Sequence, residues 1–137
     1  MKRGAFIGVL ACVAFVSAPL MAQLPWNDAP TRVDGDDIVA TRLGWPAPRV
    51  RSFEAQRRSA RDVGEERGRA ALHAFVDDAL ARSLVEPAEA SRVHTLVDSS
   101  ARRGRVRALS DGSAIVEMRV TAEPLSAAVG TELSWSR

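Results

Sequence analysis

RVRALSDGSAIVEMRV, residues 105–120, contains two alternating strand-like segments separated by the turn sequence Ser-Asp-Gly. A two-residue turn at 111–112 would mix arginines and apolar side chains on one face of the hairpin. A three-residue loop over 110–112, with Gly112 in the left-handed conformation, separates the two kinds of side chain and places Val106 opposite Val116. The sequence therefore predicts a β-hairpin in this second register.

In this register one face of the hairpin is apolar and the other is charged. Arg105 faces Glu117 on the charged side, which is an attractive cross-strand pair. The apolar side is continued by small and aliphatic residues: Ala108, Ala114, Met118 and Val120. An apolar sheet face must be covered, and amphipathic helices earlier in the chain can supply the cover.

The longest predicted helix precedes the hairpin and lies between Ser52 and Pro87. Ser52 is a suitable N-cap, and Glu54 places an acidic residue in the first turn. No proline interrupts the segment before Pro87, so about 30 residues can be helical. The second half carries apolar residues at helical spacing, and we expect it to form the core with the sheet: Leu72, Phe75, Val76 and Leu80.

The first half of this helix instead carries small residues at a spacing of four, Ala60, Gly64 and Gly68. Each glycine costs about 1 kcal/mol relative to alanine in a helix interior, so a compensating feature is expected. One interpretation is the close approach of another backbone, either within the fold or from a second subunit. The other is a frayed or kinked first half. On the first interpretation, these three residues are candidates for self-association.

A second helix is predicted to begin at Pro87, with Glu89 near its positive end. Arg102 and Arg103 are then expected in its last turn, where cations meet the negative end of the helix dipole. Gly104 is expected to supply a left-handed cap.

The remaining segments complete a small α+β fold. Residues 38–43 predict a strand, and residues 23–37 have the composition of a flexible leader. A short helix over 124–129 is expected to close at Gly130, with 131–137 as a loose tail. We therefore predict a single α+β domain over 38–130, in strand-helix-helix-strand-strand order followed by the short helix. Its three-stranded antiparallel sheet is covered on one face by one long and one shorter helix.

Residues 1–22 have the features of an export signal. Lys2 and Arg3 precede an apolar run, and Ala22 offers a small residue at the expected cleavage point. A retained membrane anchor is the alternative, because an apolar run of about 17 residues is a marginal bilayer span. We expect export to the periplasm or outer membrane with cleavage after Ala22, which leaves no integral membrane span.

Charge and cysteine content restrict the possible partners. The formal net charge of +2 includes Lys2 and Arg3, so removal of the signal leaves no net side-chain charge. A balanced chain of this kind does not favour nucleic acid as a partner. Cys12, the one cysteine, lies within the signal. The mature chain is therefore expected to have no disulfide and no cysteine-ligated metal.

The sequence shows no evident catalytic constellation. His73 and His94 are the only histidines, and an isolated helical histidine is more often a surface or satisfied residue than a base. Asp77 and Asp78 are adjacent on a helix, so their side chains diverge by about 100 degrees and cannot act as a dyad. No phosphate-binding loop or metal-ligand spacing is present. We predict a protein that is not an enzyme and has no cofactor or metal.

Three segments in this order resemble a known family. They are IVATRLGWPAP (38–48), RGRAALHAFVDDAL (67–80) and RGRVRALSDGSAIVEMRVTAEPL (103–125). Together they resemble the LPP-twenty family of small outer-membrane lipoproteins, which includes the flagellar protein FlgP. The resemblance implies helices on one side of a small antiparallel sheet, no enzymatic activity, and self-assembly, in some members as rings or discs around the flagellum. This chain departs from the family pattern because no cysteine stands at the cleavage point.

The leading hypothesis is thus a non-catalytic exported envelope protein, a structural or assembly component that forms homo-oligomers, with envelope or flagellar components as further partners. The alternative is a small-ligand or cell-wall binding module. For that alternative, Trp45 and Phe53 near the loop before the long helix are the candidate ligand contacts.

Overall fold

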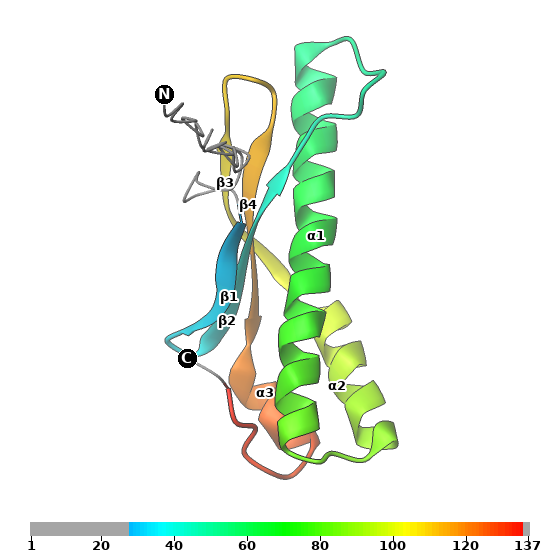
Figure 1. Cartoon of the computed structure of the whole chain (residues 1–137), viewed down its shortest axis with the longest axis vertical. Coiled ribbons are helices and arrows are strands. Elements are labelled where there is room, and N and C mark those ends of the chain that lie inside the picture. The colour runs from blue at the N-terminus through cyan, green and yellow to red at the C-terminus, as the bar shows by residue number, and fades with distance from the viewer. Residues whose placement is uncertain (1–27, 136–137) are drawn as a thin grey trace, which may run out of the picture.

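The computed structural model describes residues 28–135 as an antiparallel sheet with helices on one side (Figure 1). The predicted signal segment, including Cys12, lies outside the described residues. The elements are β1 (Asp28–Asp34), β2 (Asp37–Gly44), α1 (Phe53–Arg82), α2 (Pro87–Ser100), β3 (Arg102–Ala108), β4 (Ala114–Thr121) and α3 (Ala122–Ala128). The strand order is β1-β2-β4-β3. The predicted α+β class is confirmed, but the sheet has four strands where three were predicted.

The additional strand, β1, lies in the segment predicted to be a flexible leader. Residues 28–34 pair with β2, and Asp34 stands opposite Asp37 at the end of the ladder. The two-residue loop between them contains Gly35 with φ of 63°, as hairpin turns of this length require. The leader prediction is therefore wrong from residue 28 onward. The average composition of the predicted leader is polar, so it did not indicate the turn at Gly35 that precedes the apolar β2.

The β3–β4 hairpin has the predicted register. Val106 pairs with Val116 and Ala108 with Ala114, and Gly112 has φ of 86° in the three-residue loop. The backbone N–H of Leu109 donates to the carbonyl of Ser113 at 2.8 Å and closes this loop. Nearer the other end, β3 contains one extra residue between 103 and 106, which is a β-bulge.

The predicted boundaries of the long helix α1 are confirmed. Ser52 caps it, because Ser52 Oγ accepts a hydrogen bond from the backbone N–H of Ala55. The small-residue row predicted for self-association faces the sheet of the same chain. Ala60, Gly64 and Gly68 are all buried. A Cβ at 64 would lie 2.5 Å from Val116 Cγ2, and one at 68 would lie 2.5 Å from Met118 Cγ. The row serves close helix–sheet packing, so it is not a surface that a second copy could reach.

The second helix is shorter than predicted. It ends at Ser100 with Ala101 as its cap, and Arg102 and Arg103 begin β3. Gly104 lies within the strand and does not have the positive φ of a left-handed cap. The ladder with β4 outweighs the local helix-end signal, because an apolar hairpin face gains more by joining the sheet than two arginines gain from a helix dipole.

The segment after α3 belongs to the core, contrary to the predicted loose tail. The short helix itself lies close to the expected position, and Gly130 has φ of 64°. Leu133 is 2% exposed within the hydrophobic cluster. The ring of Trp135 stacks on that of Phe75, with 6.2 Å between centroids. The described domain therefore extends through residue 135.

Candidate functional sites: a histidine–aspartate cluster and an open sheet edge

Two histidines and two aspartates form a continuous chain of contacts between α1 and α2. His73 Nδ1 lies 2.7 Å from His94 Nδ1. On the outer sides, His73 Nε2 lies 2.7 Å from Asp98 Oδ1, and His94 Nε2 lies 2.7 Å from Asp77 Oδ1. We refer to these four side chains as the histidine–aspartate cluster.

The local sequence explains why the contacts cross between the helices. His73 and Asp77 are four residues apart on α1, and His94 and Asp98 are four residues apart on α2, so each pair shares a helix face. A short connection after Arg82 turns the chain back, and α2 packs against the C-terminal half of α1 (Figure 1). Each histidine therefore meets the aspartate of the opposite helix.

The sequence predicts that His73 and His94 are isolated, whereas the structure brings them together. The repeated spacing of His and Asp on two consecutive helices was the signal that could have indicated a cluster. Both nitrogens of each ring have a polar neighbour within the cluster. Among residues 28–135, no group of three or more suitable side chains could hold a metal ion.

The second candidate is the outer edge of the sheet. Strand β3 is the last in the strand order, and all seven of its residues are exposed. Val106 lies on the helix side of the sheet as predicted, but its side chain is 42% exposed. Helix α1 packs over β2 and β4 through its small residues, which leaves the edge strand without a helical cover.

A groove of about 350 Å³ lies between this edge and the first half of α1. We call it the edge groove. Its floor is apolar and its wall is charged, with three arginines and one glutamate: the lining consists of Val106, Ala108, Ala114, Arg57, Arg58, Arg61 and Glu54. The Nε of Arg61 is buried and has no hydrogen-bond partner among the described residues. Its nearest carboxylate oxygens lie 3.8 and 3.9 Å away, which is too far for a hydrogen bond.

The arginines of β3 differ in how firmly they are held. Arg102 Nη2 donates to Asp37 Oδ2 at 2.6 Å, and this hydrogen bond is the main reason that the pKa of Asp37 lies below its ordinary value. Arg103 donates to Glu65 of α1. By contrast, no side-chain hydrogen bond or ion pair is found within residues 28–135 for Arg105 or Arg107.

Glu117 lies behind this edge on the neighbouring strand β4. The hydrogen bond from Arg119 Nε at 2.7 Å is the main cause of its lowered pKa, and the backbone N–H and the charge of Arg105 contribute in the same direction. The predicted side-chain pair between Arg105 and Glu117 is not formed, because β3 bulges between 103 and 106 and Glu117 pairs with Arg119 on its own strand. Glu117 is already engaged with Arg119, so it does not neutralise the edge.

Trp45 and Phe53, the predicted ligand contacts, do not form one site. Both side chains are about half exposed. The guanidinium of Arg67 lies 4.8 Å from the Trp45 ring, and that of Arg57 lies 4.4 Å from the Phe53 ring. Ten helical residues separate the two arginines, which is about 15 Å along the axis. Trp45 in the loop and Phe53 at the start of α1 therefore form two separate arginine–aromatic stacks with α1.

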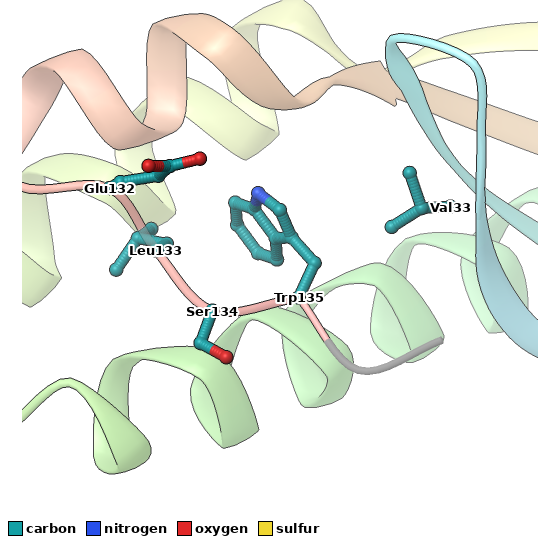
Figure 2. A pocket seen from close by; sticks show the side chains of 5 residues that line it. All are labelled: Val33, Glu132, Leu133, Ser134 and Trp135. Carbon is teal, nitrogen blue, oxygen red and sulfur yellow. The ribbon is translucent and has the colours of Figure 1, made fainter.

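A further hollow of about 460 Å³ lies beside the C-terminal segment. Figure 2 shows the indole of Trp135 standing in this hollow, with Val33 of β1 on one side and Glu132 and Leu133 on the other. The wall consists mainly of the aromatic side chain and the peptide chain that carries it. Its lining includes Glu132 and Ser134 but no basic side chain, so it offers no cation for recognition of an anionic ligand.

Comparisons with models of known protein families, with curated proteins and with solved structures give no match to this chain. Within the part of the chain that the structure describes, no helix combines the length and the apolar character needed to cross a bilayer.

Proposed function

We propose that this protein is a non-catalytic, exported envelope component that works by self-association through the open edge of β3. The observation that carries the proposal is that every residue of this edge strand is exposed, with Val106 uncovered on the helix side. The export step rests on the sequence of residues 1–22.

The part of β3 next to the 110–112 loop is suited to pair with another strand. In an antiparallel ladder, hydrogen-bonded and non-hydrogen-bonded pairs alternate. The Leu109 N–H bond to Ser113 makes that pair hydrogen-bonded, so Val106 and Ala108 direct their backbone N–H and C=O groups outward. The same two residues line the edge groove. An added strand would gain main-chain hydrogen bonds and an apolar floor.

Charge restricts which surface of a second copy can pair with β3. A symmetric contact between two β3 strands would bring the arginines of both copies together, which is unfavourable. The opposite edge of the sheet, β1, carries Asp28, Arg32 and Asp34. Asp28 is already paired with Arg67 at 2.6 Å, whereas Asp34 lies 3.4 Å from Arg119 with a side chain that is 51% exposed, so Asp34 is the carboxylate that a second copy can reach. Pro30 and an irregularity between 29 and 32 restrict regular pairing to the part of β1 that ends in Asp34. We therefore propose that β3 of one copy meets β1 of the next.

A contact between two different edges is heterologous, so it generates rings or filaments according to whether the rotation closes. The flagellar setting within this proposal rests on the sequence resemblance alone. Neighbouring genes would test it, since a flagellar gene cluster would support a flagellar role and a cluster without flagellar genes would remove it.

Sedimentation velocity of residues 23–137 tests the assembly. We expect concentration-dependent species larger than a monomer, weakened by 0.5 M salt because exposed charges are screened. The double substitution Arg105→Glu and Arg107→Glu should abolish them, whereas Arg92→Glu, an exposed charge reversal on α2, should not. Adding Asp34→Arg to the double variant should restore association. A wild-type chain that stays monomeric at every concentration would exclude this function.

Export is tested separately by mass spectrometry of the chain recovered from the periplasm of a Gram-negative host. We expect an N-terminus at Gln23. An intact N-terminus in a membrane fraction would support the retained anchor instead.

A small-ligand or cell-wall binding module is the second candidate, favoured by the half-exposed ring of Trp45. The measurement is binding of the folded chain to isolated envelope fractions. Loss of binding in Trp45→Ala, with Phe53→Ala as the matched aromatic control on the other stack, would support a site at Trp45. Unchanged binding in Trp45→Ala would remove this candidate.

A further inference from the structure

The histidine–aspartate cluster constrains where protons can lie. Aspartate at neutral pH accepts hydrogen bonds and cannot donate them. Because Asp98 and Asp77 each lie 2.7 Å from an Nε2 atom, both Nε2 atoms must carry hydrogen. A neutral imidazole has one N–H, so two neutral rings arranged in this way would direct two Nδ1 lone pairs at each other.

The observed Nδ1 to Nδ1 distance of 2.7 Å is that of a hydrogen bond and not of two opposed lone pairs. One additional proton between these atoms satisfies both rings, because the protonated ring donates and the neutral ring accepts. We propose that His73 and His94 share a single proton across the α1–α2 contact, and that this contact is a pH-sensitive latch.

The charged groups around the pair come from both helices. Asp77 is contributed by α1 and Asp98 by α2, and Arg69 of α1 donates through Nη1 to the backbone carbonyl of Asp98 at 3.3 Å. With one shared proton, the two carboxylates and the imidazole pair carry a net charge of about −1. The histidine side chains are 27% and 31% exposed, so protons can exchange with solvent.

The latch stabilises the folded protein most at an intermediate pH, and this stabilisation decreases at both higher and lower pH. Above the range in which histidine takes up protons, the shared proton leaves and two lone pairs face each other. The unfolded chain binds fewer protons there than the folded pair, so stability falls as pH rises. In acid, both rings become charged and two N–H groups oppose each other. The unfolded chain then binds more protons than the folded pair, so stability falls as pH falls. A maximum should therefore lie between the two steps.

The latch acts on the side of α2 that faces α1, whereas the helix also packs against α3 and β4. Its fully buried side chains are Val93 and Val97, while the cluster occupies the exposed side of the same contact. Opening of the cluster would therefore loosen α2 from α1 before the sheet is disturbed, since α1 is held to the sheet by its own buried row.

Histidine NMR can test the shared proton directly, since the chain has two histidines and their signals report on this pair alone. With ¹⁵N-labelled histidine we expect two coupled protonation steps that differ at least about tenfold in proton affinity. The single histidine of the His94→Gln variant should titrate in one step. The same result is expected for His73 → Gln, should the first variant fold poorly. Two independent histidines with superimposed titrations in the wild-type chain would overturn the proposal.

Thermal unfolding over the same pH range, with EDTA present, gives a second measurement. We expect a maximum in Tm, with a decrease of about 4 °C on either side. The maximum should flatten in Asp77→Asn and persist in Asp78→Asn, which alters the neighbouring exposed carboxylate outside the cluster. A Tm profile identical in these two variants would overturn the latch. So would a maximum that appears only without EDTA, because a bound metal would then replace the proton.

Discussion

Gly64 of α1 lies against the side chain of Val116 in β4 so closely that a Cβ at residue 64 would stand 2.5 Å from Val116 Cγ2. Gly68 has the same relationship to Met118 one turn later, and Gly44 of β2 lies directly against the backbone carbonyl of Ala60. These contacts set the separation between α1 and the sheet. The intrinsic helix penalty of the two α1 glycines is thus offset by packing that larger residues would prevent.

Alanine substitutions at these glycines should destabilise the fold in a definite order. Gly44→Ala should cost most, because backbone atoms that cannot move aside occupy the position of its Cβ. Gly64→Ala and Gly68→Ala should each cost about 1–3 kcal/mol by overpacking, despite better helix propensity. Urea unfolding measures these changes.

Gly104→Ala is the matched control for this series. A Cβ there would meet the far end of the Glu117 side chain, which can shift, so we expect a change of about 0.5 kcal/mol or less. Stabilisation by Gly64→Ala would contradict the close-packing explanation.

Leu133→Ala should destabilise the domain by about 2–5 kcal/mol, the usual cost of truncating a fully buried leucine. Leu133 is 2% exposed, whereas Leu84 in the α1–α2 connection is 90% exposed. Leu84→Ala is therefore the control and should change the free energy of unfolding by less than about 0.5 kcal/mol. Equal effects of the two substitutions would contradict a core position for the C-terminal segment.

Leu84→Gly should stabilise the protein. Leu84 has φ of 50°, a left-handed conformation that costs a residue with a Cβ about 1–2 kcal/mol. Glycine removes this cost, although its greater freedom in the unfolded chain reduces the gain, so we expect about 0.5–1 kcal/mol. Thermal unfolding compared with Leu84→Ala separates the backbone effect from loss of the side chain. A lower Tm in Leu84→Gly than in Leu84→Ala would contradict this explanation.

Asp37→Asn should destabilise the protein by about 1–2 kcal/mol at neutral pH, since Asp37 accepts hydrogen bonds from Arg102 and Thr121. In the folded state these bonds lower the pKa of Asp37 below its ordinary value of 3.8, and the hydrogen bond from Arg102 is the largest cause. Its contribution is therefore present above pH 3.8 and is lost as the pH falls below that value. The difference between wild type and variant should shrink in the same direction.

The neighbouring Asp36→Asn provides the control for charge at the β1–β2 turn. Its side chain is exposed at that turn, and we expect little change in the free energy of unfolding at any pH. A wild-type advantage over Asp37→Asn that persists unchanged at pH 2 would show that the carboxylate charge is not the source of the stabilisation.

Local signals in the sequence predicted α1 and the β3–β4 hairpin because these elements depend on neighbours in the chain. The Ser52 cap, the uninterrupted helix up to Pro87 and the left-handed Gly112 act over a few residues, and alternation of apolar side chains selects one register. The sequence left open what the row at 60, 64 and 68 contacts, and it predicted isolated histidines although His and Asp repeat at a spacing of four on two helices.

Which contacts these residues make depends on the tertiary structure. Whether the small-residue row meets another subunit or its own sheet depends on the path of α1 across β4. Whether His73 and His94 meet depends on how α2 packs. The same holds for β1 and Leu133, whose segments have little local preference and acquire order from the surfaces they cover. Pairing and burial between distant segments outweigh weak local propensity, because the free energy of such contacts is gained only when both partners are in place.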